Sequence, residues 1–378
     1  MPIDPSEAHS LFRESVIQFA RREMEPIVAE FEEKEQFPVA LMKKAGAAGF
    51  LGTAYDESVG GMGADRYYDA IFMEEASRCC AGITAGFFAH SYLGCYPIYK
   101  LGHAEQKRKY LAKAIRGEKI AAFALTEPSS GSDAAGLKCT AKRDGANWIL
   151  NGQKTFITNG SLCDYMIVAA YTDPSKRGDG IALFIVDCPS PGLTSRPLRK
   201  MGNHTADTAE VFLDEVRVPA ANLLGEVTGG FNWVKNNLIV GRMLYGARAL
   251  GIARSAFEEA LGYAKARHQF GQALGKFQMI KSKLARMAAT IEAMRPMVYN
   301  VIADYEAGEN IETRASMVKL FCAEQLQWIV WEALQIHGGY GYMKEYKIER
   351  IYRDARLLTI PEGTSEIHQL IIAKGLGL

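Results

Sequence analysis

The sequence contains no long hydrophobic run. No window approaches the ~18 uninterrupted apolar residues that a membrane-spanning helix needs. Residues 1–10, MPIDPSEAHS, lack the apolar core of a secretory signal peptide. We therefore expect no membrane insertion and a cytoplasmic protein. A mitochondrial matrix protein whose transit peptide had been removed would show the same pattern.

Paired cysteines and excess charge are also missing. No C-x-x-C pair occurs, which argues against a zinc site, and we expect no bound metal. A formal net charge of +1 gives no general attraction to nucleic acid, so no nucleic-acid partner is expected. The scattered cysteines are expected to be reduced, mostly buried thiols: Cys79, Cys80, Cys95, Cys139, Cys163, Cys188 and Cys322.

The hydrophobic pattern changes its period twice along the 378 residues. Up to about residue 120, apolar residues recur every three or four positions, as in helices. Short runs of strand length follow, with a hairpin signal at Asp144 and Gly145. After residue 227 long helical stripes return, typical of a packed bundle. We predict an α+β fold: an N-terminal helical domain over residues 1–120, a middle β-barrel or sheet domain over residues 121–226, and a C-terminal four-helix bundle over residues 227–378.

Two irregular segments point to chemistry. Residues 123–133, FALTEPSSGSD, form a turn-rich run whose hydroxyls and backbone N–H groups suit an anionic ligand. In residues 361–366, PEGTSE, Glu362 stands between a Pro and a Gly, where no regular helix or strand can hold it. Such a run is more often a plain surface turn, and a lone Glu in a turn is more often solvated. Together, however, a binding loop and one carboxylate indicate proton chemistry beside a cofactor.

Three further segments follow in a fixed order: residues 148–160, WILNGQKTFITNG, residues 267–278, RHQFGQALGKFQ, and residues 335–342, QIHGGYGY. The five segments together resemble the acyl-CoA dehydrogenase family of flavoproteins, and the resemblance extends from about residue 11 to the end. It implies bound FAD at the junction of the three domains. The FAD contacts that it implies are Phe123, Leu125, Thr126, Gly131, Ser132, Phe156, Ile157, Thr158, Arg267, Phe270, Gln278, Gln335, Gly338, Gly339, Thr364 and Glu366.

Within this set, the resemblance gives some residues specific roles. Thr158 is expected to donate its hydroxyl toward flavin N5. Phe156, where many family members have Trp, is expected to lie against one ring face. Strand core is the less favoured alternative for Phe156 and Ile157. Arg267 and Gln278 match a segment that reaches the cofactor of a neighbouring subunit, which implies a homotetramer with shared FAD sites.

The same resemblance implies the reaction. Glu362 would be the catalytic base, because residues 240–242, where some members carry it, contain no carboxylate. Its burial beside Ile360 and Pro361 is expected to raise its pKa. Ser132, Arg242 and Gly363 would bind an acyl-CoA substrate, and the electrons would pass to an electron-transferring flavoprotein.

The sequence is also compatible with three different activities. Ile239 stands where the family often has an acidic residue, which leaves room for an acyl-carrier-protein thioester in place of CoA. Two less favoured alternatives are an acyl-CoA oxidase and a non-enzymatic, flavin-containing relative that binds DNA.

The acyl group itself is weakly defined. Thr84 stands where glutaryl-type members carry a cation, which disfavours a dicarboxylic substrate. The aromatic residues Phe87, Phe88, Tyr92 and Tyr96 follow. If they line the pocket, the acyl group is short, branched or cyclic. Core is the favoured position for at least two of them.

Overall fold

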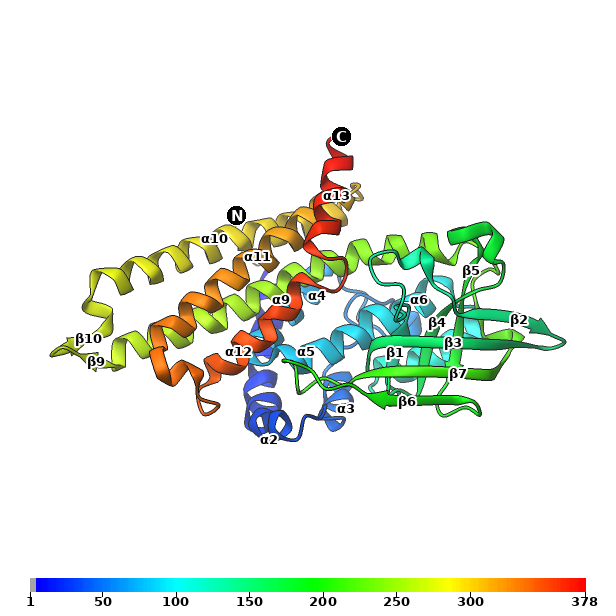
Figure 1. Cartoon of the computed structure of the whole chain (residues 1–378), viewed down its shortest axis with the longest axis horizontal. Coiled ribbons are helices and arrows are strands. Elements are labelled where there is room, and N and C mark those ends of the chain that lie inside the picture. The colour runs from blue at the N-terminus through cyan, green and yellow to red at the C-terminus, as the bar shows by residue number, and fades with distance from the viewer. Residues whose placement is uncertain (1–4) are drawn as a thin grey trace.

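The N-terminal part of the chain is helical, as its apolar spacing predicts. A computed structural model describes residues 5–378, so residues 1–4 of the polar N-terminal stretch lie outside it (Figure 1). Short π-helical turns, η1 (Ala20–Met24), η4 (Ala89–Cys95) and η5 (Lys107–Leu111), interrupt the helices. The helices are α1 (Glu7–Phe19), α2 (Val28–Glu33), α3 (Ala40–Ala47), α4 (Arg66–Cys79), α5 (Ala81–Phe88), α6 (Tyr96–Leu101), α7 (Ala104–Gln106) and α8 (Ala112–Ile115).

The middle part forms a mixed sheet with the strand order β6-β7-β3-β2-β4-β5-β8, and β1 pairs in parallel with β4. The strands are β1 (Ala121–Ala124), β2 (Thr140–Asp144), β3 (Asn147–Thr158), β4 (Tyr165–Tyr171), β5 (Ile181–Asp187), β6 (Leu193–Pro197), β7 (Thr208–Pro219) and β8 (Leu223–Leu224). The predicted hairpin at Asp144 and Gly145 joins β2 to β3. The register of β3 against β7 shifts between Lys154 and Ile157. This bulge gives Phe156 a φ of +59° and leaves its side chain 69% exposed.

Long helices form the C-terminal part: α9 (Gly230–Ala266), α10 (Gln278–Glu306) and α11 (Glu312–His337), followed by α12 (Lys347–Ala355) and α13 (Ser365–Gly375). Between α9 and α10 lies the small hairpin of β9 (His268–Gln269) and β10 (Gln272–Ala273). Helix α9 packs against α10, α11 and α4, so the two helical parts share a core. The predicted α+β fold of helices, sheet and helices is confirmed.

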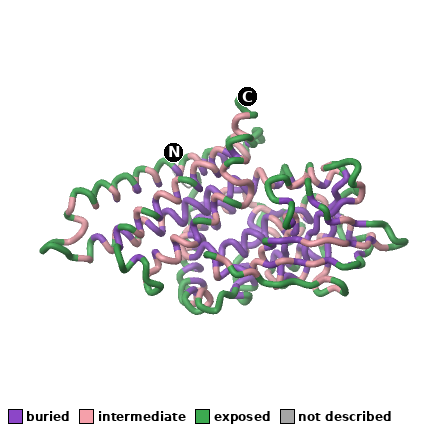
Figure 2. Tube along the Cα trace, in the orientation of Figure 1, coloured by how far each residue is buried: buried purple, intermediate pink, exposed green. Residues whose placement is uncertain are grey.

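Burial follows this arrangement. Figure 2 shows the buried residues gathered along α9 and in the centre of the sheet, whereas the β9–β10 hairpin at the far end of the bundle is exposed. Strands β4 and β5 are buried along almost their whole length, which explains their continuous apolar runs. Across residues 5–378, none of the helices combines the length and the apolar character required to cross a bilayer.

Candidate active site

Glu362 lies in the turn between the 3₁₀ segment Arg356–Thr359 and α13, with a φ of +60°. A non-glycine residue in this left-handed region stores roughly 1–3 kcal/mol of strain, and such residues cluster at functional sites. Thr364 begins α13 by accepting a hydrogen bond from the backbone N–H of Ile367, which fixes the end of the turn. The predicted placement of this carboxylate on an irregular segment is therefore correct.

The Glu362 carboxylate lies against α9 at Gly241. A Cβ atom at Gly241 would stand only 2.6 Å from Oε2, so the glycine makes the space that the carboxylate occupies. Arg242 donates from Nε to the Glu362 carbonyl oxygen over 3.3 Å, and Lys319 donates from Nζ to the Gly363 carbonyl oxygen over 2.6 Å. Within residues 5–378, Oε2 is buried and has no hydrogen-bond partner. The backbone of the turn is thus held from α9 and α11, while one carboxylate oxygen is left to react.

Burial raises the pKa of Glu362 to about 7, and the neighbouring cations Arg242, Lys319 and Arg248 oppose that shift. Burial also lowers the pKa of Lys319 to about 8. The expected rise of the Glu362 pKa through burial is confirmed. Ile360 is 50% exposed, whereas Gly241 on α9 borders the carboxylate directly. A carboxylate with a pKa near neutrality is suited to act as a general base.

The predicted flavin loop follows β1 and is fastened to β3. The Thr155 N–H donates to the Thr126 carbonyl over 2.9 Å. Lys154, which is fully buried, donates from Nζ to the Leu125 carbonyl over 3.0 Å and to Glu127 Oε1 over 2.7 Å. This buried pair was not predicted from the sequence, although it holds the loop and the strand that carry the predicted flavin residues.

The predicted FAD residues fall into two groups. The first lies at the junction of sheet and helices, on β1, the following loop, β3 and the start of α13: Phe123, Leu125, Thr126, Gly131, Ser132, Phe156, Ile157, Thr158, Thr364 and Glu366. Gly131 and Ser132 are exposed, whereas the Ile157 side chain is 2% exposed and belongs to the core. Only the backbone of Ile157 therefore remains available for a cofactor.

The second group surrounds a hollow of about 580 Å³ at the opposite end of the bundle, lined by Arg267, Gly338, Gly339 and their neighbours. Phe270 and Gln278 are exposed beside it, and Gln335 lies on the last turn of α11. Gly338 has a φ of +58° and no atom within 4 Å of a built Cβ, so a ligand can approach its backbone. An Arg fork and bare glycines suit a diphosphate.

The two groups are far apart in one chain (Figure 1). Arg242 and Arg267 are separated by about 37 Å along the axis of α9, at 1.5 Å per residue. Both groups suit FAD chemically. Their placement at opposite ends of α9 is compatible with the expectation that Arg267 and Gln278 serve the cofactor of a neighbouring subunit, and this stays a prediction.

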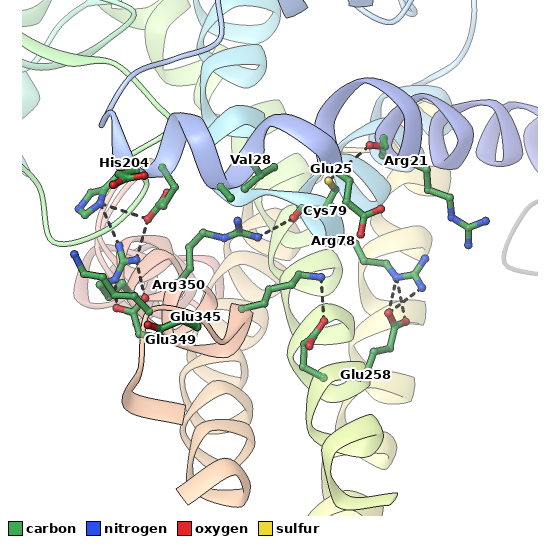
Figure 3. A pocket seen from close by; sticks show the side chains of 18 of the residues that line it. Arg21, Glu25, Val28, Arg78, Cys79, His204, Glu258, Glu345, Glu349 and Arg350 are labelled. Carbon is green, nitrogen blue, oxygen red and sulfur yellow. Dashed lines mark hydrogen bonds and ion pairs between the residues drawn. The ribbon is translucent and has the colours of Figure 1, made fainter. Parts of the chain in front are cut away.

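A wide cleft of about 890 Å³ lies elsewhere, between η1, α2 and α12 (Figure 3). Several of its charged side chains form ion pairs with one another, including Arg78 with Glu258 over 2.8 Å and Arg353 with Glu32 over 2.8 Å. Its lining residues all lie within the described part of the chain, and none of them belongs to the predicted site. The cleft is therefore not the candidate active site.

Comparison with known proteins agrees with the fold and the site. Three family models match in order: the acyl-CoA dehydrogenase N-terminal domain over residues 6–118, the middle domain over residues 122–216 and the C-terminal domain over residues 228–377. The chain is 45% identical to a 3-(aryl)acrylate reductase of Clostridium sporogenes, over 98% of this chain and 99% of that protein. It is 41% identical to the CarC subunit of a caffeyl-CoA reductase–Etf complex of Acetobacterium woodii, over 97% and 98% of the two chains.

A solved structure of butyryl-CoA dehydrogenase from Megasphaera elsdenii superposes with a TM-score of 0.96 at 36% identity, covering 100% of both chains. The arrangement of helices, sheet and helices is that of a class of flavin-dependent oxidoreductases. The chain belongs to the acyl-CoA dehydrogenase family. The predicted family, the enzyme class and FAD as the cofactor are confirmed. The roles of individual site residues remain predictions.

Proposed function

We propose that this enzyme removes the α and β hydrogens of an acyl-CoA thioester, with Glu362 as the base and an electron-transferring flavoprotein as the electron acceptor. The observation that carries this proposal is the Glu362 carboxylate, buried against Gly241 with one unpartnered oxygen within residues 5–378 and with a pKa raised to about 7. We further propose a cytoplasmic homotetramer.

In this mechanism Glu362 takes the α-proton of the thioester as the α,β double bond forms. When bound, FAD supplies the acceptor for the β-hydrogen and its electron pair. The Glu362 backbone N–H is proposed to donate to the thioester oxygen, where negative charge develops, and such a donor contributes roughly 3–4 kcal/mol to the rate. Lys319 and Arg242 hold the carbonyl oxygens of Gly363 and Glu362, so the turn presents its carboxylate and its N–H in a fixed relation.

The test is anaerobic mixing of the FAD-loaded enzyme with a panel of acyl-CoA and acyl-carrier-protein thioesters, followed by the loss of flavin absorbance. Reduction by a CoA thioester and reoxidation by electron-transferring flavoprotein are expected. Rapid consumption of dioxygen would indicate an oxidase instead, and a protein whose flavin no thioester reduces would leave only a binding role.

The reverse reaction is a second candidate, because two relatives are named as reductases of an arylacrylate and of caffeyl-CoA. The same geometry would serve this direction, since a protonated Glu362 would return the proton to the α-carbon, and FAD, if bound in its reduced form, would be the source of the hydride. Oxidation of the reduced enzyme by cinnamoyl-CoA, compared with crotonyl-CoA, measures which direction and which acyl class are preferred.

Arg242→Ala is expected to raise KM for the thioester more than it lowers kcat. Arg242 is 7% exposed, and its proposed main role is to hold the carrier portion of the substrate in ground state and transition state alike. Loss of its bond to the Glu362 carbonyl is expected to lower kcat by less, because Lys319 still holds the neighbouring Gly363 carbonyl. Steady-state rates with a dye acceptor measure both constants. Lys235→Ala, an exposed cation on the same helix, is the control. An unchanged KM with a collapsed kcat would place Arg242 in the chemical step.

Arg267→Ala is expected to weaken FAD binding by roughly 1.5–3 kcal/mol, the contribution of a charge-assisted hydrogen bond. The residue lines the hollow at the far end of the bundle, where the proposed neighbour's diphosphate would lie. Fluorescence titration of the apoprotein with FAD measures the loss, and Lys276→Ala, an exposed cation on the same segment, serves as the control. Light scattering that finds an active, FAD-loaded monomer would exclude the shared site.

A further inference from the structure

Arg248 is a buried cation with no counter-ion in contact. Arg248 is 0% exposed, and its Nη2 donates to the Ala81 carbonyl over 3.2 Å. Throughout the part of the chain that the structure describes, Nε and Nη1 have no hydrogen-bond partner. No ion pair of Arg248 is present among residues 5–378 either. The guanidinium is therefore only partly satisfied by the protein.

Bulk solvent does not reach this side chain, because Arg248 is 0% exposed. An arginine remains charged at every physiological pH. A buried charge without an anion is strongly unfavourable, and the usual remedy is a paired carboxylate. Two neighbouring cations, Arg242 and Lys319, add to the local positive charge, and they share the single carboxylate of Glu362 with Arg248. Three cations thus face one carboxylate, and a second anion would balance the excess positive charge.

The position of the guanidinium relative to the base follows from α9. Gly241, Tyr245 and Arg248 are spaced by four and three residues, so they share one face of the helix. Helical side chains point back toward the N-terminus, which brings the guanidinium over the turn of Tyr245 and toward Gly241. Arg248 Cζ lies 4.8 Å from the Tyr245 ring centre and 5.5 Å from that of Phe88.

Phe88 connects this cation to the reacting carboxylate. Its Cζ lies 3.6 Å from the position of a Cβ at Gly241, which itself borders Glu362 Oε2. The rings of Phe88 and Tyr245 meet edge to face, with centres 4.9 Å apart. An acyl chain whose α-carbon is at Glu362 thus reaches these two rings next, and the guanidinium beyond them. Both rings are nearly fully buried, so contact between an acyl end and Arg248 requires one of them to turn aside.

We propose that Arg248 binds a carboxylate at the far end of the acyl group, and that the preferred substrate is the CoA monothioester of a dicarboxylic acid. The inference rests on the proposed function and adds the substrate class. Thr84 cannot supply this contact, because it is fully buried and its hydroxyl donates to the Cys80 carbonyl over 2.8 Å. The sequence disfavours a dicarboxylic substrate because Thr84, on α5, is not a cation. Arg248 supplies the cation from a different helix, α9.

The test compares succinyl-, glutaryl-, adipyl- and pimelyl-CoA, each with an apolar isostere in which two methyl groups replace the carboxylate oxygens. For glutaryl-CoA the isostere is 5-methylhexanoyl-CoA. We expect the wild-type enzyme to favour the best dicarboxylic thioester over its isostere by about tenfold to a hundredfold in kcat/KM, as for a hydrogen bond to a charged group. Substrate-induced changes in the flavin spectrum give the binding constants independently.

Arg248→Met keeps the length of the side chain and is expected to abolish or invert this preference, with activity on the isostere retained. Arg248→Lys is expected to keep a smaller preference, because it keeps the charge but loses the fork. If Arg248→Met does not retain FAD, Arg248→Lys is the deciding variant. A preference for the dicarboxylic thioester over its isostere that is the same in Arg248→Lys as in the wild type would overturn the inference.

A wild-type enzyme that favours every isostere also overturns it, while flavin reduction by those isosteres leaves the proposed function standing. If no thioester reduces the flavin, the proposed function fails and this inference fails with it.

Discussion

Flavin reduction by substrate is expected to slow at least about a hundredfold when Glu362 is replaced by Gln, the lower range for loss of a positioned base. The amide has the same size as the carboxylate but accepts no proton at neutral pH. The contacts that hold the turn involve the backbone carbonyls of Glu362 and Gly363, so they persist in the variant. Stopped-flow spectroscopy under anaerobic conditions measures the rate, and bound FAD is expected to be unchanged.

Glu362→Asp is the matched control, because it keeps the base and withdraws it by one methylene. An intermediate rate is expected for it. A solvated turn Glu without a chemical role would tolerate both changes. If substrate reduces the flavin of the Glu362→Gln variant at the wild-type rate, Glu362 is not the base.

The pH profile provides a separate expectation. Burial raises the pKa of Glu362 to about 7, and a base works only when deprotonated. The value of kcat/KM for thioester oxidation should therefore fall about tenfold per pH unit below pH 7 and level off above it, because this ratio reports the free enzyme. A profile that is flat between pH 5 and 8 would contradict the assignment, provided that the protein stays folded and loaded with FAD.

The second large effect is expected at Lys154. This residue is 0% exposed and pairs with Glu127, which is 5% exposed. Lys154→Met leaves the Glu127 carboxylate buried without its cation, and breaking such a pair costs roughly 3–5 kcal/mol. The same change releases the Leu125 carbonyl, so FAD binding should weaken as well. Calorimetry of the holoprotein and FAD titration measure the two effects.

The double variant Lys154→Met with Glu127→Gln is the control for this pair. Removing both charges is expected to recover much of the loss, because the penalty comes mainly from the uncompensated carboxylate. Glu127 also accepts from the backbone N–H of Lys138 at Oε2 and from that of Cys139 at Oε1, and Gln keeps an acceptor for only one of these two groups, so recovery is expected to be incomplete. Equal destabilisation in the single and double variants would show that the two charges do not act as a pair.

The sequence predicts the architecture because periodicity is local. Runs such as Tyr165–Tyr171 and Ile181–Asp187 show their strand length and burial directly. Glu362 could also be found, since a residue between Pro361 and Gly363 cannot belong to a helix. The expectation that Phe87 and its neighbours are mostly core agrees with their burial, and Phe88 in addition borders Gly241.

The electrostatic surroundings of the base could not be predicted, because they join segments distant in sequence. Lys319 reaches Gly363 from α11, and Arg248 approaches from α9. The sequence nevertheless marks Lys319 as unusual. It lies on the same face of its helix as the apolar residues Cys322 and Leu326, and a charged residue is not expected on a buried face. Lys154 gave no such signal, since alternating polar residues are ordinary in a strand.

The distance between Thr158 at the sheet and Arg267 at the end of the bundle has a further consequence. If each cofactor is held by two chains, association of subunits and retention of flavin are thermodynamically linked. Dilution would then release both together, and added FAD would favour assembly by mass action. A cell that lacks riboflavin would hold this protein as incomplete subunits rather than as an empty but assembled enzyme.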